Sequence, residues 1–276
     1  MDTSFSNSSE TPQMAEPTVM LQGSSPIQSM GLLALQEMPS VIIQNKTRSA
    51  KHQSNIIKGI TTSQENLLEQ DHSTPSNQQT FATAKENVSC CCKYLLPSTC
   101  RAMETLVFPT ENEQSSDSNE NSFLTIKKKF VIPCLSIVRP KLSVDLTEGG
   151  ILTKLGELQI PLSCFRYELT VVDSSRNMLF SIKSKNFPML LSCCKQYHEE
   201  TFSIYDTNEK LVGSLTKWFA PCKCMCSREK KEEHYKLCYP RNCTKEEKML
   251  LLTAAFALNF LYFSSSSELE AQRCSD

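Results

Sequence analysis

The sequence predicts a mostly β, antiparallel fold with one hydrophobic helix near its C-terminus. Several stretches alternate apolar and polar residues on both sides of a turn rich in Asp, Asn or Gly, which is the pattern of β-hairpins. These stretches lack the three- and four-residue apolar spacing of helices. The run KMLLLTAAFALNFLYF, residues 248–263, is the most apolar in the chain and breaks the alternation.

The N-terminal part differs in composition from the rest. About the first 80 residues are rich in Ser, Thr, Gln and Asn, with few aromatic residues and scattered prolines. Such a segment cannot bury enough apolar surface to offset the entropy lost on ordering. From about Phe81 onward the chain is richer in Val, Ile, Leu, Phe and Cys. We therefore expect a mostly disordered arm followed by a single domain.

Four hairpins are predicted in that domain. The alternating stretches turn at Asp173, at Asp206 and at Gly149-Gly150, and a looser copy contains a long polar loop. They cover residues 103–129, 141–155, 167–184 and 201–218. Four hairpins with almost no helix between them predict an antiparallel sheet or barrel.

The terminal run predicts a helix at 245–263. Thr244 has the side chain of an N-cap, and Glu246 and Glu247 place acidic groups in the first turn. The apolar part of such a helix is about 22 Å long, less than the roughly 30 Å hydrocarbon core of a bilayer. Length therefore favours a buried helix over a membrane span. A helix that is apolar on all sides must be enclosed, and a β-barrel would enclose it.

Composition excludes several function classes. The net charge is −1, which predicts no general attraction to nucleic acid, and Lys127-Lys128-Lys129 is typical of a solvated strand end. The N-terminus has no basic start and no apolar stretch, so we expect no signal peptide and reduced cysteines. No catalytic motif is present, and we expect that the protein is not an enzyme.

The 14 cysteines leave one metal alternative open. Cys222, Cys224 and Cys226, together with Cys193-Cys194, could supply four thiolates to zinc. Structural zinc sites usually space their ligands as C-x-x-C, and none of these pairs does. Zinc is therefore the weaker interpretation of these cysteines.

The stretch YPRNCTKEEKMLLLTAAFALNFLYF, from Tyr239, resembles the C-terminal segment of the phospholipid scramblases. There an aromatic-proline step leads through a short acidic loop into an apolar helix that ends in phenylalanines. Further stretches resemble other parts of the same family: MGLLALQEMPSVIIQN from Met30, FATAKENVSCCC from Phe81, LLSCCKQYHEETFSIYD from Leu190 and GSLTKWF from Gly213. The resemblance covers most of residues 30–265 and identifies a divergent member.

The resemblance implies a tubby-like antiparallel β-barrel that encloses a hydrophobic C-terminal helix and is preceded by a disordered N-terminal arm. The expected boundaries are an arm at 1–29, a lead-in segment at 30–80, a domain at 81–265 with its terminal helix at 245–263, and a tail at 266–276. Asn259 stands where the family has an Asp, which removes a charge from the helix. The residues expected to characterise the apolar helix are Leu250, Leu251, Leu252, Phe256, Asn259, Phe260 and Phe263.

In the family, the segment before the terminal helix carries several aspartates and is the proposed calcium site. This sequence offers Glu232, Glu233, Asn242 and Thr244 instead, and Lys231 falls where the family has an Asp. Calcium prefers six to eight oxygen ligands, several of them carboxylates. We therefore expect a degenerate calcium site that is weak or lost.

Family members often carry a dense run of cysteines, taken to be palmitoylated, before the central hairpin. Here that position holds Cys134 alone, whereas Cys90, Cys91 and Cys92 form a different cluster. These four residues are candidates for S-acylation. Acyl chains on adjacent cysteines would supply the two-chain anchor that stable membrane residence needs.

The resemblance implies a phospholipid scramblase, which moves phospholipids in both directions between leaflets without ATP, here with weakened calcium dependence. The expected location is the cytoplasmic face of the plasma membrane, with the nucleus as a second location because Gly213–Phe219 resembles an import segment. The expected partners are membrane phospholipids and further proteins, and not nucleic acid. The alternative is a membrane-tethered tubby-like module that binds a lipid or protein without translocation.

Overall fold

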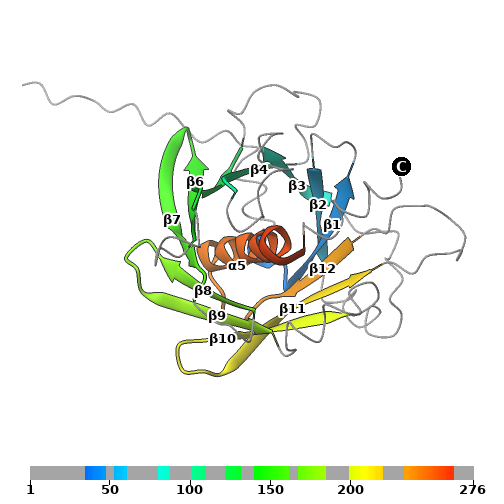
Figure 1. The fold of residues 1–276 in the computed structure, drawn as a ribbon, viewed down its shortest axis with the longest axis vertical. Coiled ribbons are helices and arrows are strands. Elements are labelled where there is room, and N and C mark those ends of the chain that lie inside the picture. Colours follow the sequence, from blue (N-terminus) through cyan, green and yellow to red (C-terminus); the bar gives the residue numbers. More distant parts are fainter. Residues whose placement is uncertain are drawn as a thin grey trace, which may run out of the picture.

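The computed structural model describes residues 35–47, 53–60, 80–87, 101–109, 122–131, 140–161, 167–184, 199–219 and 233–263. In this part of the chain the strands form a closed antiparallel barrel, and the C-terminal helix lies inside it (Figure 1). The strands are β1 (Ser40–Thr47), β2 (Gln53–Ile60), β3 (Thr80–Asn87), β4 (Met103–Pro109), β5 (Leu124–Lys128), β6 (Lys141–Glu148), β7 (Ile151–Gln159), β8 (Glu168–Asp173), β9 (Met178–Ser184), β10 (Glu200–Tyr205), β11 (Leu211–Phe219) and β12 (Glu233–Cys238). The helix is α5 (Lys245–Leu258), which continues into the π-helical turn η3 (Asn259–Phe263). The expected barrel around a hydrophobic C-terminal helix is confirmed.

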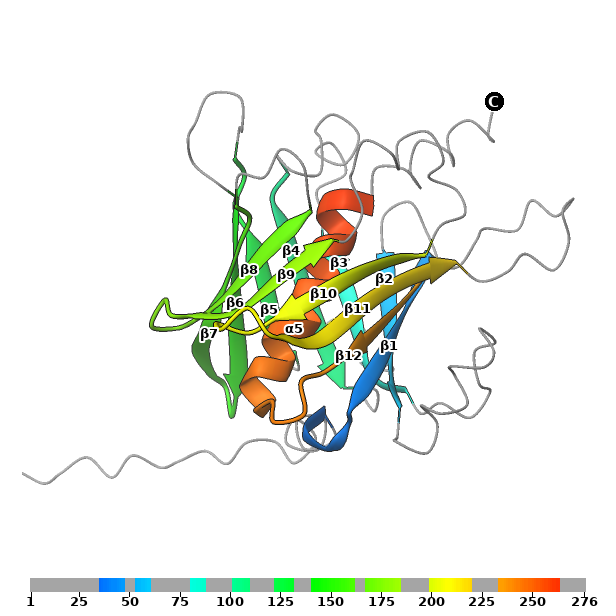
Figure 2. The same cartoon turned by 90° about the horizontal axis from the view of Figure 1, so that it is seen from below.

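The barrel is a meander in which each strand pairs with its neighbours in sequence. The circle closes because β1 pairs with β12 as well as with β2. Since each strand runs opposite to the one before it, successive connections alternate between the two ends of the barrel. We call the end at which α5 begins the start end, and the end at which η3 stops the finish end. The turns β6–β7, β8–β9 and β10–β11 all lie at the start end (Figures 1 and 2).

The four expected hairpins are confirmed as the pairs β4–β5, β6–β7, β8–β9 and β10–β11. The β6–β7 turn uses Gly149 and Gly150 with φ of 58° and 79°, the positive values that a two-residue type I′ turn requires. In the other two tight turns a carboxylate accepts backbone hydrogen bonds. Asp173 accepts from the N–H of Asn177 at 2.8 Å, and Asp206 accepts from the N–H of Lys210 at 2.9 Å.

The barrel begins at Ser40 and not at Phe81. Strands β1 and β2 lie within the lead-in segment 30–80, and without them the barrel would not close. Their short apolar runs, VII in β1 and II in β2, are surrounded by Ser, Gln and Asn, so the average composition of this long region hides them. The arm at 1–29 and the tail at 266–276 lie outside the described residues.

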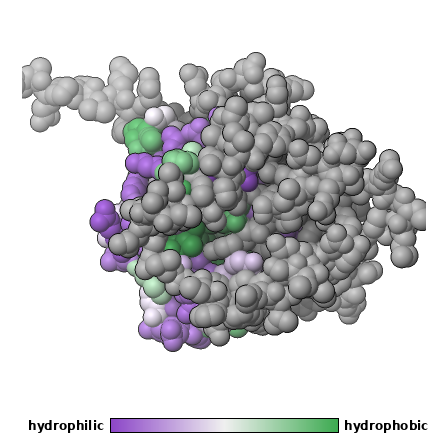
Figure 3. Space-filling view, viewed as in Figure 1, coloured by the Kyte–Doolittle hydropathy of each residue, from purple (hydrophilic) through white to green (hydrophobic). Residues whose placement is uncertain are grey.

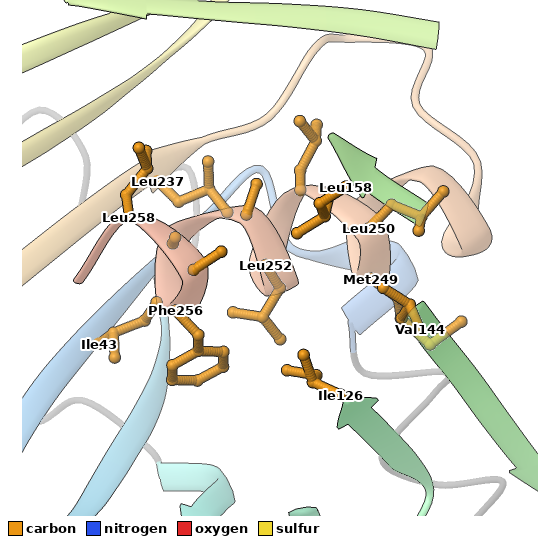
Figure 4. Packing of buried hydrophobic residues seen from close by; sticks show 14 of the residues in the cluster. Ile43, Ile126, Val144, Leu158, Leu237, Met249, Leu250, Leu252, Phe256 and Leu258 are labelled. Carbon is orange, nitrogen blue, oxygen red and sulfur yellow. The ribbon is translucent and has the colours of Figure 1, made fainter. Parts of the chain in front are cut away.

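Helix α5 is the core of the barrel. Every residue from Lys248 to Leu258 is buried. Figure 4 shows its side chains meeting residues from several strands, which are Ile43 of β1, Ile126 of β5, Val144 of β6, Leu158 of β7 and Leu237 of β12. The helix is apolar on all sides because strands surround it. The expectation of a buried helix is confirmed. Within the described ranges no helix is both long enough and apolar enough to cross a membrane.

Candidate functional site

The start of α5 is fixed by a capping box. The hydroxyl of Thr244 accepts a hydrogen bond from the backbone N–H of Glu247 at 3.2 Å, and the Glu247 carboxylate accepts one from the N–H of Thr244 at 2.8 Å. Two of the N–H groups that a helix start leaves without partners are satisfied in this way. The expected N-cap is confirmed, and the Thr244 hydroxyl is already used by it.

Lys248 joins the core helix to the segment before β1. Its ammonium donates to the backbone carbonyls of Leu35 at 3.2 Å, Gln36 at 2.7 Å and Met38 at 2.7 Å, and lies 5.3 Å from the centre of the Tyr239 ring. Burial lowers the pKa of Lys248, and the neighbouring Cys243 acts in the opposite direction. We did not foresee this contact from the sequence. The available signal was a single lysine at the start of an otherwise apolar run.

Cys243 lies beside this contact, and its thiol is unreactive near neutral pH. Burial, and then the nearby Glu247 carboxylate, raise the pKa of its thiol to about 12. Because the thiolate is the nucleophile and the metal ligand, a thiol with so high a pKa is inert near neutral pH. Cys243 is therefore a packing residue at the helix start.

The residues expected at the calcium site are not all brought together. Asn242 lies exposed in the turn before α5, and Thr244 caps the helix. Glu233 begins β12, which spans about 17 Å before the chain reaches this turn. The backbone of Glu233 therefore lies toward the finish end, at the opposite end of β12 from the turn that holds Asn242 and Thr244. Glu232 lies outside the described residues.

In the described ranges, no group of three or more His, Cys, Asp or Glu side chains is placed to hold a metal ion. The weakness of calcium binding stays a prediction. The zinc alternative concerned Cys193, Cys194, Cys222, Cys224 and Cys226, and all of these lie outside the described residues.

At the finish end, inward-facing polar side chains surround the last turn of the helix. The Tyr235 hydroxyl donates to the side-chain oxygen of Asn259 at 2.6 Å. The ammonium of Lys217, on the neighbouring strand β11, lies 5.5 Å from the centre of the Tyr235 ring. Ser184 donates to the buried carboxylate of Glu200 across β9 and β10. Asn259 thus makes the hydrogen bond that a buried amide needs.

Two further buried cations lie against Phe260 on the opposite wall. The guanidinium carbon of Arg101 is 5.7 Å and the Lys128 ammonium 5.8 Å from the centre of its ring, and Lys128 donates to the Arg101 carbonyl at 2.5 Å. Helix α5 has no basic residue in its last turn. The carbonyl end of a helix carries partial negative charge, so cations near it are stabilising. Here the barrel wall supplies those cations.

We refer to these residues as the polar ring, which comprises Arg101, Lys128, Ser184, Glu200, Lys217, Tyr235 and Asn259. Our sequence interpretation of Lys127-Lys128-Lys129 as a solvated strand end was wrong for Lys128. Lys127 and Lys129 are exposed, whereas Lys128 is buried. The alternation of β5 predicts this, because Leu124, Ile126 and Lys128 share one face. Such cations can pair with carboxylates, phosphates or helix carbonyls.

The expected helix residues lie where the buried-helix interpretation requires. Leu250, Leu251, Leu252 and Phe256 are buried in α5, and Asn259 and Phe260 are buried in η3. Phe263 ends η3, and its side chain lies outside the described residues.

The S-acylation candidates Cys90, Cys91, Cys92 and Cys134 also lie outside the described residues. The cysteines that the structure describes are Cys238 and Cys243, and neither forms a disulfide.

These features define the class of the protein. It is a closed antiparallel β-barrel with a hydrophobic helix as its core and a polar ring at the end of that helix. Comparison with protein-family models places it more closely. The model of the scramblase family, described as Scramblase, matches residues 31–265. The match covers most of the chain, and the protein therefore belongs to the scramblase family. No curated protein and no solved structure gives a match.

Family membership supports three general statements about function. The scramblase family acts on membrane phospholipids, and membership implies association with membranes. It is not a family of catalytic enzymes in the usual sense. The matched range includes both β1 and η3, so it spans the complete barrel and its core helix.

Proposed function

We propose that this protein moves phospholipids between the leaflets of a membrane, in both directions and without ATP. The observation that carries the proposal is the family match over residues 31–265, which includes every described element of the barrel. No reaction chemistry is required, because scrambling breaks no covalent bond. The protein has only to lower the barrier that head groups meet in hydrocarbon, where unpaired polar groups are costly.

The geometry restricts the route that a lipid can take. The interior of the barrel holds α5, and the described residues of that helix from Lys248 to Leu258 are buried against the strands. A lipid therefore does not pass through the barrel while the helix is in place. We infer that head groups move along the outer surface of the barrel. The protein would disturb the lipid packing of the bilayer next to that surface.

A second candidate function is a tethered module that binds a lipid or protein without translocation. The enclosed helix favours it, because in this structure the most apolar segment contacts strands and not lipid. The tether would be acyl chains on Cys90, Cys91, Cys92 or Cys134, and two such chains suffice for stable residence. We further propose the cytoplasmic face of the plasma membrane as its location, with protein partners and nuclear import as secondary features.

Calcium dependence is proposed to be weak or lost. Asn242 is neutral, the Thr244 hydroxyl is used as a cap, and the backbone of Glu233 lies at the other end of β12. Calcium that bound with useful affinity would stabilise the fold by mass action and raise Tm. We expect no measurable shift of Tm between chelator and about 1 mM calcium, a concentration that saturates only sites tighter than millimolar.

The experiment is fluorescent-lipid scrambling in liposomes that contain the purified chain, without ATP, in calcium and in chelator. The expected result is loss of lipid asymmetry in both conditions at equal rates. Asn242→Ala is the matched control, because it removes an exposed candidate ligand and leaves the Thr244 cap intact. Folded protein that does not scramble in either condition would overturn the first proposal and favour the tethered module. Scrambling that needs calcium and is lost in Asn242→Ala would overturn the view of the calcium site.

A further inference from the structure

Large hydrophobic side chains are exposed mainly at one end of the barrel. Among the described residues, Ile151 is 65% exposed, Leu152 59%, Leu211 58%, Phe130 50% and Met178 40%. All except Phe130 directly follow a tight turn at the start end. Ile151 and Leu152 begin β7, Met178 begins β9 and Leu211 begins β11. We call these four residues the tip surface.

The three tips belong to one end of the molecule. Their turns lie on the side from which α5 starts (Figures 1 and 2). An ion pair of 3.3 Å between Lys245 at the helix start and Glu148 at the β6–β7 turn confirms that this turn lies next to the helix start. In Figure 3, which looks at the barrel from the side of the finish end, the coloured surface shows hydrophobic patches separated by hydrophilic surface. Three neighbouring hairpins thus present apolar side chains from one end.

The β6–β7 hairpin extends past the end of the neighbouring strand β8. Residues 151–154 are all exposed, although consecutive residues of a strand point to opposite faces. Strand β7 pairs with β8 only from Gly156 to Gln159, so its first residues have β6 as their one described strand neighbour. The tip is therefore open on the β7 side, whereas β6 remains paired with β5 as far as Leu146. Ile151 and Leu152 point to opposite faces of the hairpin.

The charges beside the tips balance locally. Lys154 pairs with Glu157, Lys245 with Glu148, and Lys183 with Glu209 at 4.0 Å. The carboxylates of Asp173 and Asp206 accept backbone N–H groups within their own turns. Arg176 and Lys210 add two cations at the β8–β9 and β10–β11 turns, and Asp173 and Asp206 add two carboxylates, so the described residues of the tips carry no excess of positive charge. A surface of this kind fits a zwitterionic interface and gains little from anionic lipid.

We propose that the tip surface docks on a phospholipid bilayer, with Ile151, Leu152, Met178 and Leu211 inserted at the level of the head groups and upper acyl chains. The inference rests on the proposed action on membrane phospholipids and assigns the face of the barrel that meets them. It requires no acyl chain and no calcium ion. The helix start and the segment held by Lys248 then face the membrane, and the polar ring faces away from it.

A bilayer accounts for the pattern better than a protein strand does. A partner strand added to the free edge of β7 would cover Ile151–Leu155 and leave Met178 and Leu211 unexplained. That edge also carries Lys154 next to a register shift between Val144 and Asp145, two features that oppose strand addition. A membrane contacts all three tips at once, because they lie at the same end.

The test is flotation of the full, unacylated chain with vesicles of phosphatidylcholine alone, at about 0.1 M and about 0.5 M salt, two conditions that separate electrostatic from apolar binding. Ile151→Ser with Leu152→Ser is the first variant, and Met178→Ser with Leu211→Ser is the second. Phe130→Ser is the matched control, since Phe130 is also an exposed apolar residue but follows β5 at the finish end. Equal Tm for all variants shows that the barrel is folded.

We expect the wild type to bind at both salt concentrations and each tip variant to bind about tenfold or more weakly, as loss of two buried apolar side chains predicts. Phe130→Ser should bind within about twofold of the wild type, because a surface substitution away from the contact has little effect. Wild-type protein that does not float would overturn the docking proposal, and so would tip variants that bind normally. Binding only to anionic vesicles at low salt would overturn it as well. Tip variants that turn a dimer into a monomer with unchanged flotation would show that copies of the chain pair through this surface, and would also overturn it.

The two proposals fail in different ways. Tip-dependent flotation without scrambling supports docking and contradicts translocation. Scrambling that persists in both tip variants supports translocation and contradicts docking through these residues.

Discussion

Leu252→Lys is the substitution that most directly tests the enclosed helix. Leu252 is fully buried in α5, on the side of the helix that faces Ile126 of β5 (Figure 4). A lysine there lies four residues, about 6 Å, deeper along the helix than Lys248. The three carbonyls that accept hydrogen bonds from Lys248 are already occupied, so a second ammonium would be buried without acceptors.

The expected cost follows from the protonation of that lysine. Buried lysines without partners have pKa values of about 5–6, compared with about 10.4 in an unfolded chain. At pH 7 the folded protein must therefore hold the amine neutral, which costs about 4–5 kcal/mol at about 1.4 kcal/mol per pH unit. Typical domains have a free energy of unfolding of about 5–15 kcal/mol, so the variant should be marginally folded.

The free energy of unfolding of Leu252→Lys should depend on pH in a way that the wild type does not. Between about pH 6 and 10 the unfolded state of the variant binds more protons than the folded state, so the free energy of unfolding should rise with pH by about 1.4 kcal/mol per unit. Urea unfolding followed by circular dichroism measures it, with Leu252→Met as the uncharged control of similar shape, expected to cost less than about 1.5 kcal/mol. A Leu252→Lys protein with wild-type stability at every pH would refute the enclosed helix.

The remaining predictions concern the two ends of the helix. Lys248→Met should lower the free energy of unfolding by about 1–3 kcal/mol in urea, because three carbonyls lose a charged donor; an unchanged urea midpoint would show that the contact is not stabilising. Tyr235→Phe should lower the free energy of unfolding by about 1–2 kcal/mol, since the buried Asn259 oxygen loses its donor. Adding Asn259→Leu to the same chain should recover part of that loss. Equal free energies of unfolding for the single and the double variant would contradict a pairwise bond. Burial raises the pKa of the Cys243 thiol to about 12, so the folded chain keeps a proton that the unfolded chain loses above about pH 8.5. The stability linked to this thiol is complete below that pH and is lost as pH rises toward 12, and the urea midpoint of Cys243→Ala should therefore fall less steeply from pH 8 to 10.5 than that of the wild type.

The fold was largely predictable because its strands are local. In a meander each hairpin is encoded by one continuous stretch, and the turns at Asp173, Asp206 and Gly149-Gly150 carry residues that favour those backbone conformations. Strands β1 and β2 were not recognised from local composition, because their short apolar runs are diluted by polar neighbours. The pairing of β1 with β12 joins segments far apart in the sequence, and no local pattern encodes such a contact.

The site was less predictable, because its contacts depend on which end of the barrel a residue occupies. Sequence placed Glu233 and Asn242 close together, but β12 is extended and separates them. The alternation of β5 turns Lys128 inward, and only the position of Phe260 in the closed barrel shows what that lysine meets. Lys248 belongs to an apolar run in the sequence, and its carbonyl acceptors come from a segment more than 200 residues away.

The enclosed helix and the family activity are compatible if the barrel stays closed while lipids move. Release of α5 would expose Met249, Leu250, Leu252, Phe256 and Leu258, each worth about 1.5–3 kcal/mol when buried, so the loss is on the order of 10 kcal/mol. That figure equals the whole free energy of unfolding of a typical domain, which means that releasing the helix amounts to unfolding the barrel. A closed barrel can act on a bilayer only from its outside. The described surface offers apolar side chains for that purpose at the hairpin tips of the start end, where Glu148 of the β6–β7 turn is ion-paired with Lys245 at the helix start. Insertion of those tips would disturb the lipid packing of one leaflet next to the outer surface of the barrel. A phospholipid head group that leaves the water there would move along that outer surface.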